Sequence, residues 1–137
     1  MYDRILVPMA LDHGVSDKTL RVAQGLASGK GEIIALHVYE SPQKSVGPYL
    51  EQKAIEASMA QAKSILAEKT AQYAGVRSEF VTGHTARTII DYAADNGVDC
   101  IVMGSHKPGL ADYFLGSTAA RVVQHAHCAV HVVRDRS

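Results

Sequence analysis

Apolar residues gather in five short runs along the chain, and mixed polar segments separate them. The runs cover residues 4–8, 32–39, 76–81, 99–103 and 129–133. They are short and rich in Val and Ile, which favours strands, and Pro8 ends the first of them. The run over 76–81 alternates, whereas the others are nearly continuous, which is typical of strands buried on both faces of a sheet.

Between these runs, apolar residues recur every three or four positions, which predicts amphipathic helices. The predicted helices cover residues 17–28, 50–73, 85–96 and 117 to about 126. Ser16 is the candidate N-cap of the first helix, glycines at 29 and 31 end it, and Gly97 is the candidate C-cap of the third. Residues 40–49 contain two Pro and read as a surface excursion. The apolar stripes consist of Leu20, Val22, Ala23 and Leu26, then Ile55, Met59, Ala62, Leu66 and Lys69, and then Ile89, Ile90, Tyr92 and Ala93.

Strand and helix therefore alternate from one end of the chain to the other. Parallel strands joined by helical crossovers need helices on both faces of the sheet. Because such crossovers are right-handed, the pattern predicts an α/β fold with a doubly wound parallel sheet, in a single domain over residues 1–137. Ligands of these sheets bind beyond the carboxyl ends of the strands, where the strand order reverses.

Composition narrows the possible partners. Lys+Arg and Asp+Glu are equal at 14 each, aromatic residues make up 6%, and Trp is absent. Neither a basic field nor aromatic stacking platforms are available for nucleic acid, so that partner is not expected. No apolar run approaches the roughly 20 residues that span a bilayer, and no signal peptide is recognisable, so we expect a cytoplasmic protein away from membranes. Cys100 and Cys128 are predicted to be buried thiols.

The segment between the fourth strand and the last helix concentrates glycine and hydrogen-bond donors. Gly104 follows the strand directly, and Gly116 precedes the helix, where positive φ and close approach of a ligand to the backbone are available to glycine. The amides at 116–118 would open the helix, where anions such as phosphate are favoured, and Ser117 or Thr118 would cap it or turn a hydroxyl toward a phosphate. His106 and Lys107 add donors. Gly and Ser are also common caps and loop His and Lys are usually solvated, so these residues alone leave a phosphate site and an ordinary loop both open. Neither the GxxxxGK[ST] motif nor the GxGxxG motif is present.

Five segments together resemble the universal stress protein family. They are "RILVP", "ALHVYE", "IVMGSH", the glycine-bounded loop after it, and "LGSTAARVVQHAHCAVHVVR", in the order of that family and over essentially the whole chain. The resemblance implies a five-stranded parallel sheet of order 3-2-1-4-5, a homodimer formed through the last strand, and in many members ATP bound between the first and fourth strands. It also implies a role in the stress response, with an unknown protein partner.

Site residues follow from the resemblance position by position. Pro8 and the residues after it, Met9 and Ala10, would border the adenosine, and the backbone of Val38 would meet the adenine. Met103 and Gly104 would line the ribose and phosphate channel. His106, Gly116, Ser117 and Thr118 would hold the phosphates of ATP or AMP, with Mg²⁺ as a further possible component.

Two positions depart from the family pattern. Lys107 stands where the second glycine of the ATP-binding loop is typical, and the loop from there to Gly116 is one residue shorter, with Gly109 as a shifted source of flexibility. Lys107 would either offset phosphate charge or block the channel. Ala10 stands where the family typically has Asp, and Asp12 lies two residues later. A dimeric scaffold without nucleotide and a slow ATPase or self-phosphorylating protein therefore remain alternatives, the latter using Ser117 or Thr118 as acceptor.

The remaining histidines suggest no catalytic group. His125, His127, Cys128 and His131 lie near one another in sequence, but helix and strand geometry points them in different directions, so no metal site is expected. His125 suits a helix C-terminus, and His131 is expected to face a partner chain. We expect His37 to bond to a backbone group, and His84 to serve as a cap or turn residue at the ligand edge.

Overall fold

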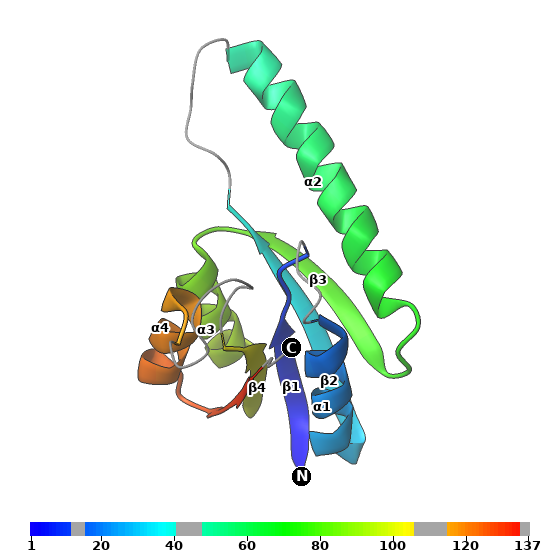
Figure 1. The fold of residues 1–137 in the computed structure, drawn as a ribbon, viewed down its shortest axis with the longest axis vertical. Coiled ribbons are helices and arrows are strands. Elements are labelled where there is room, and N and C mark those ends of the chain that lie inside the picture. The colour runs from blue at the N-terminus through cyan, green and yellow to red at the C-terminus, as the bar shows by residue number, and fades with distance from the viewer. Residues whose placement is uncertain (12–15, 41–47, 106–114, 135–137) are drawn as a thin grey trace.

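A computed structural model describes residues 1–11, 16–40, 48–105 and 115–134 (Figure 1). Strands and helices alternate as their patterns predict. The elements are β1 (Tyr2–Pro8), α1 (Ser16–Leu26), β2 (Ala27–Tyr39), α2 (Pro48–Thr70), β3 (Val76–Thr82), α3 (Thr85–Asp95), β4 (Cys100–Gly104), α4 (Ser117–His125) and β5 (Ala129–Val133).

The strands form one five-stranded parallel sheet in the order β3-β2-β1-β4-β5. Both the fold class and the strand order are confirmed. In the register of the sheet, Ile5 of β1 lies between Ile33 of β2 and Cys100 of β4. The chain builds outward from β1 to β3 and then returns to the other side of β1, so the strand order reverses between β1 and β4. A crevice for ligands is expected at the carboxyl ends of these two strands.

The sheet separates two apolar cores. On one face, Leu20 and Ala23 of α1 and Leu66 of α2 pack over side chains such as Ile5 and Val102. On the other face, α3 and α4 cover the strands with Ile89, Ala93, Ala119 and Val122. Figure 1 shows α3 and α4 together on one side of the sheet, with α1 and α2 on the other. The predicted apolar stripes of α1 and α3 therefore do face the sheet.

α1 ends earlier, and β2 begins earlier, than their patterns indicate. The helix stops at Leu26 rather than near residue 28, and the strand starts at Ala27 rather than Glu32. Ala27 pairs with Tyr2, and the register then shifts before Arg4 pairs with Glu32. This extra pairing draws the glycine-containing segment into the sheet, where the Ser28 hydroxyl donates to the Asp3 carboxylate at 3.1 Å.

α2 is less buried than its pattern indicates. Of the five positions in its predicted stripe, Leu66 is buried, whereas Ile55, Met59, Ala62 and Lys69 are half-buried. The helix extends past the end of the sheet in Figure 1. It ends at Thr70, whose hydroxyl donates to the Leu66 carbonyl at 2.9 Å, and Gly75, at φ 78°, then completes the turn into β3. The last helical turns are thus the part of α2 that anchors it to the core.

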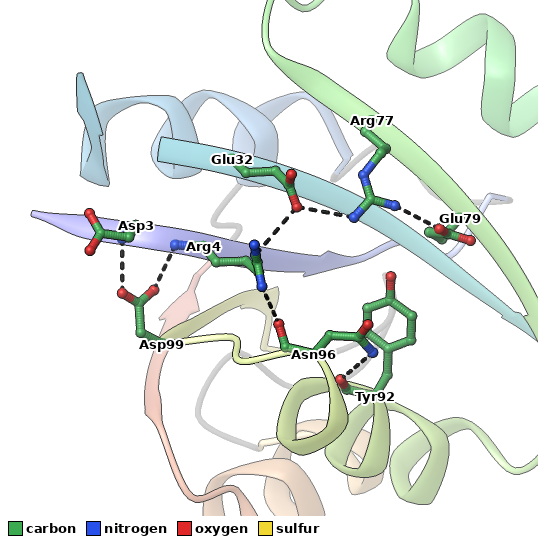
Figure 2. Close-up of polar contacts among 8 residues, drawn as sticks. All are labelled: Asp3, Arg4, Glu32, Arg77, Glu79, Tyr92, Asn96 and Asp99. Atoms are coloured by element: carbon green, nitrogen blue, oxygen red, sulfur yellow. Dashed lines mark hydrogen bonds and ion pairs between the residues drawn. The ribbon is translucent and has the colours of Figure 1, made fainter. Parts of the chain in front are cut away.

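Charged side chains connect the strands near their amino ends (Figure 2). Glu32 of β2 forms ion pairs with Arg4 of β1 at 3.4 Å and with Arg77 of β3 at 3.0 Å. Arg77 forms a further ion pair with Glu79 at 2.6 Å. The hydrogen bond with Glu32 raises the pKa of Arg77 above its ordinary value. Each exposed pair contributes little alone, but together they link three neighbouring strands.

The same cluster also holds the end of α3. Arg4 donates through Nη1 to the Asn96 carbonyl at 2.6 Å, and the Asp99 carboxylate accepts the amides of Asp3 and Arg4 (Figure 2). Gly97 follows at φ 65°, the left-handed conformation that favours glycine after a helix. Asn96 is the C-cap, so the predicted glycine lies one residue beyond it. These contacts make the amino ends of the strands a structural part of the fold.

Within the described ranges, no helix is both long enough and apolar enough to cross a membrane.

Candidate functional site

The carboxyl ends of β1, β2 and β4 bring most of the described candidate residues to one edge of the sheet. Pro8 ends β1, Val38 is the second-to-last residue of β2, and Met103 and Gly104 end β4. Val38, Met103 and Met9 are buried, at 8%, 5% and 5% exposure, whereas Ala10 is exposed. Candidates from three strands thus meet at the point where the strand order reverses.

Met9, the first residue after β1, is tied to β2 through both of its backbone polar groups. Its amide donates to the Leu36 carbonyl at 2.8 Å, and its carbonyl lies 2.8 Å from Nδ1 of His37. The prediction that His37 has a backbone partner is confirmed. The imidazole also lies against Phe80 of β3, with ring centroids 5.7 Å apart. The chain therefore leaves β1 along a defined path beside β2.

At β4, the chain leaves the sheet and returns to the same place. The Ser105 amide donates to the Val133 carbonyl at 3.0 Å, and the Ser105 carbonyl accepts the Gly116 amide at 2.7 Å. Ser105 is 2% exposed. These two bonds place the amino terminus of α4 directly beside the carboxyl ends of β4 and β5.

α4 begins without a capping side chain. Its N-cap is Gly116, and the helix proper starts at Ser117, so of the two roles predicted for Ser117 and Thr118 the capping role is wrong. Gly116 has φ −62° and ψ 158°, an extended conformation open to any residue, so positive φ is not the reason for glycine here. Among the residues that the structure describes, no side chain accepts a hydrogen bond from the amides of Ser117 or Thr118. The positive end of the helix dipole is thus unneutralised by any of these side chains.

α3 starts at the same edge, but a carboxylate already occupies its amino terminus. Glu40, which follows β2, accepts hydrogen bonds from the amide of Thr85 at 2.8 Å and from its hydroxyl at 2.5 Å. His84 is the N-cap residue, and its carbonyl accepts the Thr88 amide at 2.8 Å. A second anion is disfavoured beside this carboxylate. Between the amino termini of α3 and α4, that of α4 is therefore the better place for a phosphate.

Four candidate residues, Asp12, His106, Lys107 and Gly109, lie outside the described residues. Those that are described, Pro8, Met9, Ala10, Val38, Met103, Gly104, Gly116, Ser117 and Thr118, include no carboxylate. This set suits a ligand held by backbone groups and hydroxyls, as a nucleotide is at a helix amino terminus. Within these described residues, Mg²⁺ therefore finds none of the carboxylates through which it is usually bound.

The other sequence candidates are dispersed. Over the described part of the chain, no group of three or more His, Cys, Asp or Glu side chains is arranged to hold a metal ion. Cys100 is buried, as predicted, but Cys128 is only half-buried, and both thiols are free. Burial raises the pKa of Cys100 to about 11 and raises that of Cys128 as well, so neither is an activated nucleophile. His125 does lie in the last turn of α4, and His131 is exposed on β5.

Two residues of this edge escape prediction from sequence alone. Glu40 belongs to a polar stretch that reads as a surface loop, and its partner Thr85 is far away in the chain. Ser105 is one polar residue after an apolar run. The signal available for both is their position, since each directly follows or nearly follows the end of a predicted strand.

These features define a doubly wound α/β protein whose candidate site lies at the carboxyl ends of β1, β2 and β4. The model of the universal stress protein family matches residues 1–134, and the chain belongs to this family.

Proteins of similar sequence or structure match this chain along nearly its whole length. Universal stress protein G from Shigella flexneri is 27% identical over 146 residues, which cover 98% of this chain and 100% of the relative. The solved structure of universal stress protein UspA from Lactobacillus plantarum is 25% identical, with a TM-score of 0.79 over 97% of this chain and 98% of that chain.

Two further structures with the same fold were solved with nucleotides. One is a universal stress protein in complex with cAMP, 22% identical, with a TM-score of 0.69 over 98% of this chain and 99% of that chain. The other, from Arabidopsis thaliana, has AMP bound and is 16% identical, with a TM-score of 0.66 over 98% of this chain and 93% of that chain.

Proposed function

We propose that this chain is a cytoplasmic, homodimeric stress-response module that binds an adenine nucleotide, ATP or AMP, at the carboxyl edge of its sheet. The observation that carries the proposal is the amino terminus of α4, which opens with Gly116 beside the end of β4 and has no capping side chain among the described residues. The cAMP and AMP complexes of two proteins with this fold support the choice of an adenine nucleotide.

In this proposal the base lies against the backbone of Val38, and the adenosine is bordered by the residues that follow β1. Phosphates reach the amides that open α4, where the helix dipole favours negative charge. Lys107 offsets part of the phosphate charge, as the glycine typical of the family at that position would not. The complete proposed site comprises Pro8, Met9, Ala10, Asp12, Val38, Met103, Gly104, His106, Lys107, Gly109, Gly116, Ser117 and Thr118.

The second copy pairs with β5. This strand lies at the edge of the sheet, with Ala129 and His131 exposed. An edge strand presents unpaired backbone groups that another strand can complete, which supports a dimer through β5.

Calorimetric titration with AMP, cAMP and ATP, the last with and without Mg²⁺, tests the nucleotide site. We expect saturable binding that is lost in Gly116→Val, because a side chain there fills the space in which a phosphate approaches the backbone. The extended backbone of Gly116 is compatible with valine, and circular dichroism establishes that the variant is folded. Gly29→Val is the matched control: Gly29 has open space around its Cβ position and lies at the amino end of β2.

Absence of binding by the wild-type protein at millimolar nucleotide, in every form tested, would overturn the proposed site and leave a scaffold without a nucleotide. Equal binding by Gly116→Val would instead remove α4 from the site.

A further inference from the structure

The carboxyl end of β2 departs from the regular ladder of a parallel sheet. In a parallel pair, the amide of one strand residue and the carbonyl of the same residue point to the same neighbouring strand, and successive residues alternate sides. The Leu36 carbonyl accepts the Met9 amide on the β1 side, and the Tyr39 carbonyl accepts the Gly83 amide on the β3 side. Val38 is two residues beyond Leu36, so its amide and carbonyl point toward the β1 side as well.

The regular acceptor for the Val38 amide is the Met9 carbonyl. That carbonyl lies 2.8 Å from Nδ1 of His37 instead, and in the described part of the chain no acceptor is found for the Val38 amide. Val38 is only 8% exposed. In a residue this buried, an amide without a partner is unfavourable, and such groups in native proteins call for an explanation. A bound ligand would explain the unpartnered Val38 amide, because it would supply the missing hydrogen-bond acceptor.

We propose that His37 is a positioning residue for the nucleotide: its imidazole removes the Met9 carbonyl from the β1–β2 ladder and so leaves the Val38 amide for a ring nitrogen of the base. The inference rests on the proposed function for its ligand. A carbonyl only accepts, so Nδ1 of His37 carries the proton that is donated to Met9. Phe80 packs against the same ring and holds its orientation.

His37 also fixes the wall beside the base. Met9 is 5% exposed and belongs to the core, and its amide and carbonyl contact Leu36 and His37, so three contacts hold it in place. Ala10, the next residue, is exposed and is a proposed neighbour of the adenosine. The histidine therefore does two things at once, since it orders the end of β1 and keeps the edge of β2 open.

Nitrogen-15 NMR of the nucleotide-free protein tests the arrangement without any ligand. In the wild type we expect the imidazole of His37 to carry its proton on Nδ1 and no coupling across a hydrogen bond between the Val38 amide and the Met9 carbonyl. In His37→Leu that coupling should appear, because the carbonyl returns to the ladder. A proton on Nε2 alone, or a Val38–Met9 coupling already present in the wild type, would overturn the inference.

Titration with AMP tests the consequence for binding. We expect His37→Leu to bind about tenfold more weakly, which corresponds to one lost hydrogen bond. His37→Asn, whose amide group can donate from nearly the same place as Nδ1, should recover most of that affinity. His127→Leu, at an exposed histidine away from this edge, is the control and should bind as the wild type does. A merely structural role would not distinguish Leu from Asn in this way once both variants are shown to be folded.

Equal AMP affinity in His37→Leu and the wild type would overturn the role in binding. If the wild-type protein binds no adenine nucleotide at all, the proposed function fails, whereas the spectra still decide how His37, Met9 and Val38 are arranged.

Discussion

Gly31 allows a close approach of the backbone where the chain has passed from α1 into β2. A Cβ atom at this position would lie 2.9 Å from the Tyr2 carbonyl oxygen and 3.0 Å from the Ser28 amide nitrogen, both backbone atoms that cannot rotate away. The absence of a side chain thus lets the segment after α1 pack closely against the first residue of β1. This contact accompanies the early start of β2 at Ala27.

Gly31→Ala should therefore destabilise the protein by about 1–3 kcal/mol, the usual cost of forcing an extra carbon into a packed site. Urea unfolding followed by circular dichroism measures the change. Gly29→Ala is the matched control, because nothing lies within 4 Å of its Cβ position, and it should change stability little. Equal losses in the two variants would mean that the tight contact at Gly31 is not the cause.

Residue-scale predictions from sequence succeed where the environment is local. The apolar positions Leu20, Ala23 and Ile89 face the core because their spacing alone determines one side of a helix. Gly116 is a different case. Its position before a helix suggests a residue with positive φ, yet its backbone is extended. What the structure shows at Gly116 is a hydrogen bond from its amide to the Ser105 carbonyl. Residue spacing in the sequence does not reveal this contact.

At the scale of elements, the start of the helix α3 is capped by a residue that directly follows the strand β2. Glu40 follows β2 and accepts both the amide and the hydroxyl of Thr85, the first residue of the helix. The carboxylate also lies at the positive end of the helix dipole. It links the end of β2 to the helix that covers the same strand.

Glu40→Ala should lower the unfolding free energy by about 1 kcal/mol, as expected for loss of a capping group. Glu40→Gln should lose less, because an amide oxygen still accepts the Thr85 bonds without the charge. Thermal and urea unfolding give both values, and Glu68→Ala, at an exposed glutamate of α2, serves as the control. If Gln and Ala cost the same, hydrogen bonding to Thr85 contributes nothing to the helix.

The hydrophobic pattern predicts which helices and strands form, but it does not always predict the residues at which they begin and end. The five runs all became strands, because each is long enough and apolar enough to be buried between helices. The end of α1 depends on pairing between Ala27 and Tyr2, and the partial exposure of α2 depends on where the sheet ends. Both are tertiary effects that a local pattern does not contain.

At the scale of the whole molecule, alternation of strand and helix indicates a parallel doubly wound sheet but not the order of its strands. The order 3-2-1-4-5 was expected only from the family resemblance, and the pairing of β1 with both β2 and β4 confirms it. That order leaves β3 and β5 at the two edges. α2 packs beside β3, whereas the outer side of β5 is the edge at which we propose that a second copy pairs.

The backbone of β5 tells which residues would bond to that second copy. The Val133 carbonyl accepts the Ser105 amide on the β4 side, so by alternation His131 and Ala129 also point their backbone groups inward. Val130 and Val132 consequently point theirs outward, toward the free edge. A proline at an outward position removes one edge amide without breaking the ladder to β4, which is where sheets tolerate proline.

Val132→Pro should therefore convert a dimer to a monomer while the sheet stays intact. Val132→Ala, which shortens the same side chain but keeps the amide, should remain dimeric. Sedimentation equilibrium measures the oligomeric state, and circular dichroism establishes that each variant is folded. If Val132→Pro is folded and still dimeric at the concentration at which the wild type is, the two copies do not pair through the backbone of β5, and another surface must join them.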